Sequence, residues 1–188
     1  EALYKIALDG SLKRDLVLAR PDADIGGLIT IGRQNRVVGA TYSTDKNYAV
    51  FFDPGLAALQ ASLDKALPGS PEITFVDSSS DENKLLLFAS SDTDPGKYYL
   101  FDKPSHKLTP LLEARPELDG VTLAVQTPIT YKAADGTAIP AYLMMTQRRS
   151  GTKLQAIVMP HGGPQARDQW GFAWLGQYFG NRGFGVLQ

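Results

Sequence analysis

The feature that most constrains the fold is a repeat within a run of short β-strand patterns. The segment L-V-L-A-R-P-D at residues 16–22 recurs as L-L-E-A-R-P-E at residues 111–117, a shift of 95 residues. The same shift places Y-K-I at residues 4–6 on Y-L-F at residues 99–101. Propeller blades repeat every ~40–50 residues, so this shift equals about two blades. The repeat therefore predicts part of a β-propeller, with chance similarity of a short motif as the alternative.

Short strands dominate the first 112 residues and predict an all-β unit of antiparallel blades. The expected strands are residues 3–8, 16–19, 28–31, 36–42, 47–52, 72–76, 84–89, 98–101 and 107–112. One helix interrupts them, with Asp53 as its N-cap and Pro54 at its first helical position. Leu56, Leu59, Leu63 and Leu67 recur at helical spacing on one face. We expect this helix to pack on the edge of a blade.

The pattern changes near residue 120. A hairpin is predicted from strands 123–131 and 138–146 around the turn at 134–137. A buried strand at 155–159, a helix over 165–181 capped by Asp168, and a strand at 184–187 follow. A hairpin followed by strand, helix and strand is typical of the start of an α/β domain with a partly parallel sheet. The predicted fold class is therefore mixed.

The end of the strand at 155–159 is the strongest candidate for a site. The apolar run A-I-V-M at 156–159 stops at P-H-G-G-P, and such a run predicts a strand buried on both faces. Ligands bind at the carboxyl ends of strands in open α/β sheets. Gly162 and Gly163 allow a close backbone approach there, and their N–H groups can stabilise the oxyanion of acyl transfer. The pair equally suits a tight turn from strand to helix.

Composition excludes several kinds of chemistry. The chain has no cysteine, which excludes disulfides, thiol nucleophiles and zinc–thiolate sites. Its two histidines, His106 and His161, lie in different regions, so no metal and no cofactor is expected. No serine follows His161 at nucleophile-elbow spacing, which favours hydrogen bonding within the turn over a role as base. A net charge of −1 and the lack of an apolar run of ~20 residues predict neither nucleic acid nor membrane as a partner.

Arg167 and Trp170 are the remaining candidates, for substrate binding. The structural alternative for Arg167-Asp168 is a helix cap or an ion pair. The structural alternative for Trp170 is a position in the core. Asp92 and Asp94 lack the glycine and glutamate of a calcium loop, so a hairpin turn is favoured there.

Four segments together resemble the prolyl oligopeptidase family of serine peptidases, in which a β-propeller is joined to a carboxyl-terminal α/β-hydrolase domain. They are residues 91–102, 115–123, 130–143 and 158–187, and the most specific stretch is M-P-H-G-G-P-Q-A-R-D-Q-W-G-F at 159–172. The resemblance implies that residues 1–117 are the carboxyl-terminal part of a propeller, about two blades or slightly more. It implies that residues 118–188 are the truncated amino-terminal part of the hydrolase domain.

The resemblance also assigns a role to the glycine loop. In the family, this loop contributes to the oxyanion hole; a tyrosine hydroxyl serves from the position of His161 in the dipeptidyl-peptidase and prolyl-oligopeptidase branches. The H-G-G-P pattern is similar to the acylaminoacyl-peptidase branch, where a backbone N–H of the second glycine serves. The role therefore falls on Gly163, with Gly162 in the same loop, and strict post-proline specificity is not implied.

The resemblance implies a serine-type peptidase acting on short peptides, at aminoacyl or acylaminoacyl bonds, through an acyl-enzyme. The family's serine, aspartate and histidine are expected beyond Gln188, so the chain alone is expected to be inactive. An esterase with a β accessory domain and a non-catalytic propeller–hydrolase scaffold are the alternatives. A peptide substrate is the expected partner, and unpaired blade edges predict contacts with another copy or with further parts of the protein. The compartment stays open between cytoplasm and periplasm.

Overall fold

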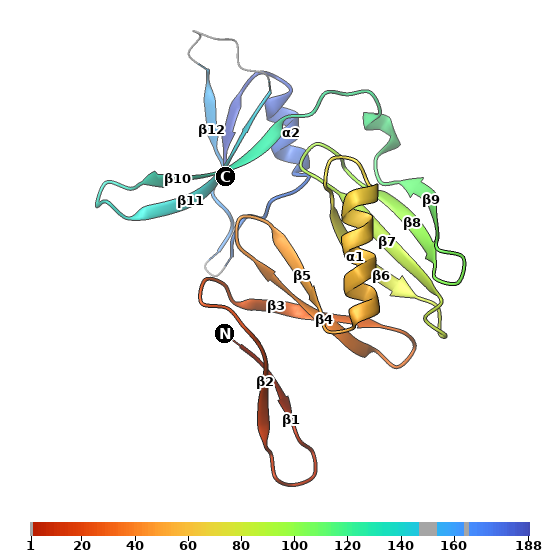
Figure 1. Ribbon diagram of the computed structural model, residues 1–188. Helices are drawn as coiled ribbons and strands as arrows, with labels where there is room; N and C mark the ends of the chain where they lie inside the picture. The colour runs from red at the N-terminus through yellow and green to blue at the C-terminus, as the bar shows by residue number, and fades with distance from the viewer. Residues whose placement is uncertain (1, 147–153, 164–165) are drawn as a thin grey trace.

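The computed structural model describes residues 2–146, 154–163 and 166–188, which form four β-sheets and two α-helices (Figure 1). The first three sheets and the helix between them are formed, in chain order, by β1 (Ala2–Ile6), β2 (Arg14–Ala19), β3 (Ile25–Ile31), β4 (Arg36–Ser43), β5 (Asn47–Phe51), α1 (Pro54–Ala66), β6 (Glu72–Ser78), β7 (Lys84–Ser90), β8 (Lys97–Asp102) and β9 (Lys107–Glu113). A 3₁₀ turn (Pro116–Leu118) leads to β10 (Val125–Lys132), β11 (Ala138–Met145), β12 (Ala156–Val158), α2 (Trp174–Gly180) and β13 (Gly185–Leu187).

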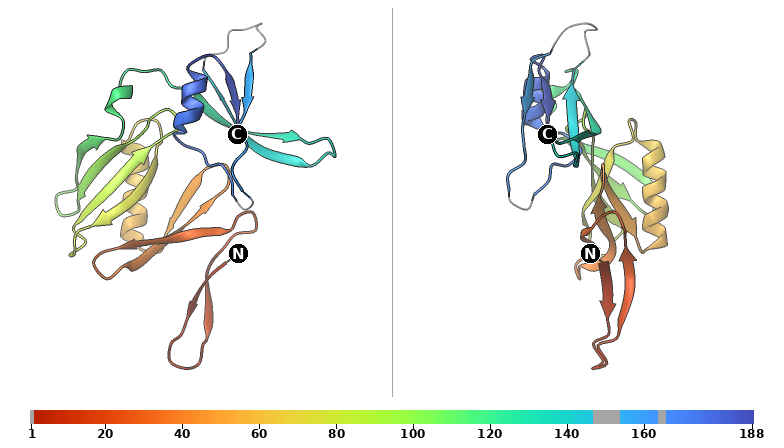
Figure 2. Two further views of the ribbon diagram at one scale, coloured as in Figure 1. Left: turned by 180° about the vertical axis from the view of Figure 1, so that it is seen from behind. Right: turned by 90° about the vertical axis from the view of Figure 1, so that its left-hand side faces the viewer.

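The first three sheets are antiparallel and are ordered β1-β2, β3-β4-β5 and β6-β7-β8-β9. The last has the four strands of a propeller blade. The β1–β2 hairpin extends away from the remainder of the chain, as Figures 1 and 2 show. The chain is therefore mostly β-sheet with propeller-like blades, as the density of strand patterns predicted.

The 95-residue repeat falls on two equivalent hairpins. It places β1 on β8 and β2 on β9, and both pairs are antiparallel. The register slips between Leu3 and Tyr4 in the first hairpin, and between Tyr98 and Tyr99 in the second. These two positions are related by the same shift of 95 residues. A β-bulge is a specific feature of a strand pair, so its recurrence supports a structural repeat over a chance one.

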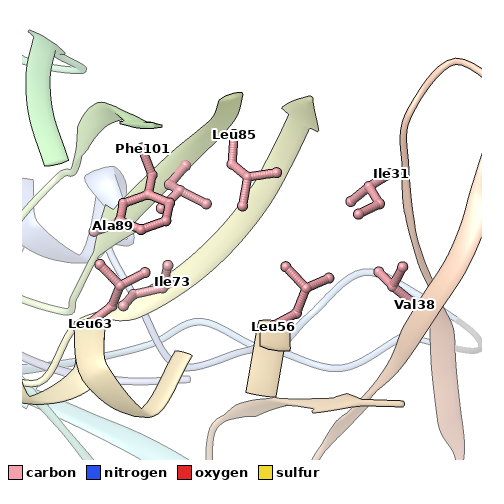
Figure 3. Close-up of a cluster of buried hydrophobic side chains, with 9 residues drawn as sticks. Ile31, Val38, Leu56, Leu63, Ile73, Leu85, Ala89 and Phe101 are labelled. Atoms are coloured by element: carbon pink, nitrogen blue, oxygen red, sulfur yellow. The ribbon is translucent and has the colours of Figure 1, made fainter. Parts of the chain in front are cut away.

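Helix α1 forms where the leucine spacing predicted it, on one side of the blade sheets (Figure 2). The Asp53 carboxylate caps it by accepting hydrogen bonds from the N–H groups of Gly55 and Leu56, at 2.9 and 3.2 Å. Leu56 and Leu63 are buried in the blade core, shown in Figure 3. The other buried members of that core are Ile31, Val38, Ile73, Leu85, Leu87, Ala89 and Phe101. The helix thus joins two neighbouring blades through one apolar cluster.

Replacing Asp53 by alanine is expected to lower the stability of α1 by about 1 kcal/mol, because two N–H groups lose their acceptor. The pKa of Asp53 is lowered by the hydrogen bond from Leu56 N–H and by Arg36, whose Nη1 lies 3.3 Å from the carboxylate. A lowered pKa means that the stabilisation is complete above the unfolded pKa of about 3.9 and is lost as the pH falls through the folded pKa. Amide hydrogen exchange of α1 measured against pH tests this. The Asp53→Asn variant should retain the cap and lose this pH dependence.

The fourth sheet is mixed and has the order β10-β11-β13-β12. β10 and β11 form the predicted antiparallel hairpin, and β12 and β13 are parallel with α2 in the connection between them. Ala124, Met144 and Val186 are fully buried there and form a core of their own, against which Phe179 packs. None of the helices in the described ranges is long and apolar enough to cross a membrane.

The helix predicted over residues 165–181 is wrong in its first half. α2 begins only at Trp174, and Asp168 caps nothing, since the N-cap residue is Ala173. Trp170 instead lies in a bend, and Gly171 takes a φ of 141°, which no helix contains. The aromatic spacing that indicated a helix comes from an anchored loop followed by a short helix.

The strand at the glycine loop is less covered than its apolar run predicted. β12 is the edge strand of the mixed sheet and has β13 as its only partner among the described strands. Val158 is 67% exposed, so the prediction of burial on both faces is wrong for this chain. An edge strand can present an apolar side chain that no described element covers.

Candidate functional site

The glycine loop leaves the mixed sheet at the carboxyl end of β12. The N–H of Met159 donates to Leu187 O at 2.8 Å, the last ladder bond before Pro160. Gly162 and Gly163 follow as exposed residues, and a Cβ on either would meet no atom within 4 Å. Among the described residues, no acceptor engages their N–H groups. Two backbone donors are therefore exposed at a strand end; Pro164, the last residue of the motif, lies outside the described residues.

His161 orders this loop through a hydrogen bond to the backbone of the next residue. Its Nδ1 lies 2.7 Å from the carbonyl oxygen of Gly162. A carbonyl oxygen only accepts, so Nδ1 is the donor in this contact. This contact corresponds to the hydrogen-bonding role that the sequence favoured over a catalytic base.

A cleft of about 690 Å³ opens beside the loop, between the β10–β11 hairpin and the turn that joins β4 to β5. Its apolar wall comes from the hairpin: Pro128, Ile129, Ile139, Pro140 and Ala141. Its polar wall includes His161, Arg167, Asp168 and Asp45. The pKa of Asp45 is lowered by the hydroxyls of Thr44 and Tyr48, which donate to its carboxylate at 2.9 and 3.0 Å. The cleft therefore combines an apolar wall with fixed charges, next to the exposed glycine donors.

Arg167, a predicted substrate-binding residue, lines this cleft and also contacts the blade region. Its guanidinium donates to the carbonyl oxygens of Ser43, at 3.3 Å, and Thr44. No ion pair with Asp168 forms in the described part of the chain; Nε donates instead to the Asp168 carbonyl at 3.3 Å. Arg167 thus attaches the segment that follows the glycine loop to the β4–β5 turn.

Trp170, the second predicted substrate-binding residue, is 7% exposed and does not line the cleft. Its indole N–H donates to Gln126 O at 3.1 Å, and Lys46 Nζ lies 3.8 Å above the ring. Trp170 borders a second cavity of about 400 Å³, which Glu72 also lines. Burial raises the pKa of Glu72. These contacts show an anchoring role, and contact with substrate stays a prediction.

A buried polar junction that the sequence did not indicate joins the mixed sheet to the β7–β8 turn. Gln177 on α2 accepts from Ala124 N–H at 2.7 Å and donates to the carbonyl oxygens of Ala124 and Asp92, both at 2.8 Å. The Asp92 carboxylate in turn accepts from Gln126 N–H at 2.8 Å. Asp92 lies in the hairpin turn that was favoured over a calcium loop. Glutamines between apolar residues, in A-V-Q-T and L-G-Q-Y, were the available signal.

No group of three or more His, Asp or Glu side chains lies close enough to hold a metal ion within residues 2–146, 154–163 and 166–188. The donors available to a bound molecule at the cleft are instead backbone N–H groups and the Arg167 guanidinium.

The architecture therefore consists of propeller-like blades that contact a mixed sheet, with exposed glycine N–H groups at the end of one of its strands. No family model matches the chain. Dipeptidyl aminopeptidase BIII of Pseudoxanthomonas mexicana is 31% identical over 196 residues, which cover 99% of this chain and 28% of that protein. The chain spans about a fifth to a little over a quarter of the length of the curated relatives it matches.

Solved structures show the same fold. A puromycin-hydrolyzing peptidase of Mycobacterium tuberculosis gives a TM-score of 0.66 at 16% identity, over 99% of this chain and 29% of that one. The acylaminoacyl peptidase of Pyrococcus horikoshii gives 0.59 at 16% identity, over 93% and 26%. The chain is related to the prolyl oligopeptidase family of peptidases, which confirms the resemblance read from its residues.

Proposed function

We propose that this chain is part of a serine-type peptidase that hydrolyses short peptides, at aminoacyl or acylaminoacyl bonds, through an acyl-enzyme. Residues 1–117 would supply propeller blades and residues 118–188 the start of an α/β-hydrolase domain. Two separate buried cores, one in the blades and one in the mixed sheet, support that division. The parallel β12–α2–β13 unit beside an antiparallel hairpin supports the hydrolase assignment.

The observation that carries the proposal is the pair of exposed N–H groups at Gly162 and Gly163, which no described residue engages, at the carboxyl end of a parallel strand. A fixed N–H stabilises a tetrahedral oxyanion because it needs no reorganisation when the charge develops. Gly163 would donate to the oxyanion, and the adjacent cleft would receive the peptide.

The nucleophile would come from outside these residues, since the sequence contains no G-x-S-x-G elbow. A serine-directed phosphonate should label the full-length protein and leave the isolated 188-residue chain unlabelled. The full-length protein should turn over aminoacyl or acylaminoacyl anilides. Ester turnover without anilide turnover would favour an esterase, and the absence of both would favour a non-catalytic scaffold.

A further inference from the structure

Each residue from Ser43 to Lys46, at the turn between β4 and β5, contacts a side chain of β11 or of the segment after the glycine loop. In chain order, the Arg167 guanidinium donates to the carbonyls of Ser43 and Thr44, the Tyr142 hydroxyl donates to the Asp45 carbonyl at 2.8 Å, and Lys46 Nζ lies over the Trp170 ring at 3.8 Å. The three contacting side chains come from β11 and from the segment that follows the glycine loop. One short turn of the blade region therefore touches both walls of the cleft.

This turn is held rigidly by its own strands. Thr44 N–H donates to Lys46 O at 3.0 Å, and the Tyr48 hydroxyl donates to the Asp45 carboxylate at 3.0 Å. The rings of Tyr42 and Tyr48 stack across the two strands, with centroids 5.2 Å apart and an interplanar angle of 14°. A side chain bound to such a turn is bound to a fixed point.

Because Arg167 is attached to this turn and is close to the glycine loop in the sequence, it can limit the movement of that loop. It lies four residues after Gly163, so at most about 14 Å of extended chain separates the two Cα atoms. Its planar guanidinium presents several donors in a fixed fork, which suits two carbonyl oxygens on adjacent residues. Within the described part of the chain, its recorded partners are backbone carbonyls, so its charge is not engaged by a carboxylate.

We propose that Arg167 is a positioning residue: it fastens the Gly162–Gly163 loop to the β4–β5 turn and so fixes the direction of the Gly163 N–H. The inference rests on the proposed function and extends it. An oxyanion forms only after substrate has bound, so a loosened donor weakens transition-state stabilisation more than substrate binding. A displacement of about 1 Å is sufficient to cost up to about 10²-fold in rate.

The test is kinetic and uses the full-length protein with an aminoacyl or acylaminoacyl anilide. Arg167→Ala is expected to lower kcat by about tenfold or more with KM within about twofold, since the lost contact orients the donor. Added guanidinium ion should restore part of the kcat, and Arg167→Lys should fall between the wild type and the alanine variant because it keeps one donor. A purely structural role would produce none of this rescue.

Two further variants keep the test decisive. Tyr142→Phe removes the second attachment to the turn while keeping a buried ring, and it should lower kcat by a smaller factor in the same direction. Arg182→Ala is the matched control, because Arg182, like Arg167, donates to a backbone carbonyl, here Tyr178 O at 3.1 Å. Arg182 also lies over the Tyr178 ring and does not line the cleft. The kcat of this variant should equal that of the wild type.

The outcomes separate the inference from the function. A wild-type protein without peptidase activity would overturn the proposed function itself. An active wild type whose Arg167→Ala and Tyr142→Phe variants keep their kcat would overturn the positioning role alone. Loss of kcat that guanidinium does not restore would also overturn it, as would an equal loss in Arg182→Ala.

Discussion

Replacing Gly163 by proline in the full-length protein is expected to lower kcat for a peptide anilide by about 10²–10³-fold, with little change in KM. Proline has no N–H, so it removes the proposed oxyanion donor, and the loss of one such donor has effects of that size. Among the described residues a Cβ at Gly163 has no neighbour within 4 Å, and its φ is not positive, so the added carbon itself meets no clash. The proline ring also fixes φ, so the missing donor is identified by the loss of affinity for an oxyanion-forming inhibitor.

Gly163→Ala is the matched control, because it adds a Cβ and keeps the N–H. Its kcat should stay within about a few-fold of the wild type, because alanine keeps the N–H that stabilises the oxyanion. A peptide aldehyde that places an oxyanion in the hole should lose affinity for the proline variant and not for the alanine variant. Equal losses in both variants would show that the shape of the loop, and not the N–H of Gly163, supports catalysis.

Local chemistry explains what the sequence predicted. Asp53 and Pro54 mark the start of α1 because capping and a fixed proline φ depend only on neighbouring residues. The strand patterns succeeded because alternation and turn residues are local as well. The repeat predicted paired hairpins, and a bulge opposite Leu3–Tyr4 in the first hairpin and opposite Tyr98–Tyr99 in the second agrees with it.

Contacts between distant segments explain what the sequence did not predict. The segment before α2 is anchored by Trp170, whose indole N–H donates to the carbonyl of Gln126, 44 residues earlier. The role of Arg167 depends on a turn 123 residues away. Nothing in the local pattern of Q-A-R-D-Q-W distinguishes a helix from an anchored loop, because both place apolar residues at similar spacing. The glycine donors were found because their signal, an apolar run that ends in Gly-Gly, is local.

Replacing Gln177 by leucine is expected to destabilise the junction between α2 and the β7–β8 turn by about 2–4 kcal/mol, since each buried polar group left without a partner costs about 1–3 kcal/mol. Gln177 is 3% exposed, and its amide forms three hydrogen bonds, with Ala124 N–H, Ala124 O and Asp92 O. Leucine fills a similar volume and leaves all three backbone groups without a partner. Hydrogen exchange of the Ala124 amide, followed in peptides that cover residues 123–126, should accelerate by more than about tenfold.

The same exchange measurement separates the junction from a general loss of stability. Gln34→Leu is the control, because Gln34 is exposed in the turn between β3 and β4, and a surface change there should stay within about 0.5 kcal/mol. Exchange in α1, whose core lies in the blades, should change little in Gln177→Leu if the two cores open independently. Equal acceleration in α1 and at Ala124 would mean that the blades and the mixed sheet open as one unit. In that case the buried junction, and not the connector near residue 117, would determine how the two parts of the chain behave.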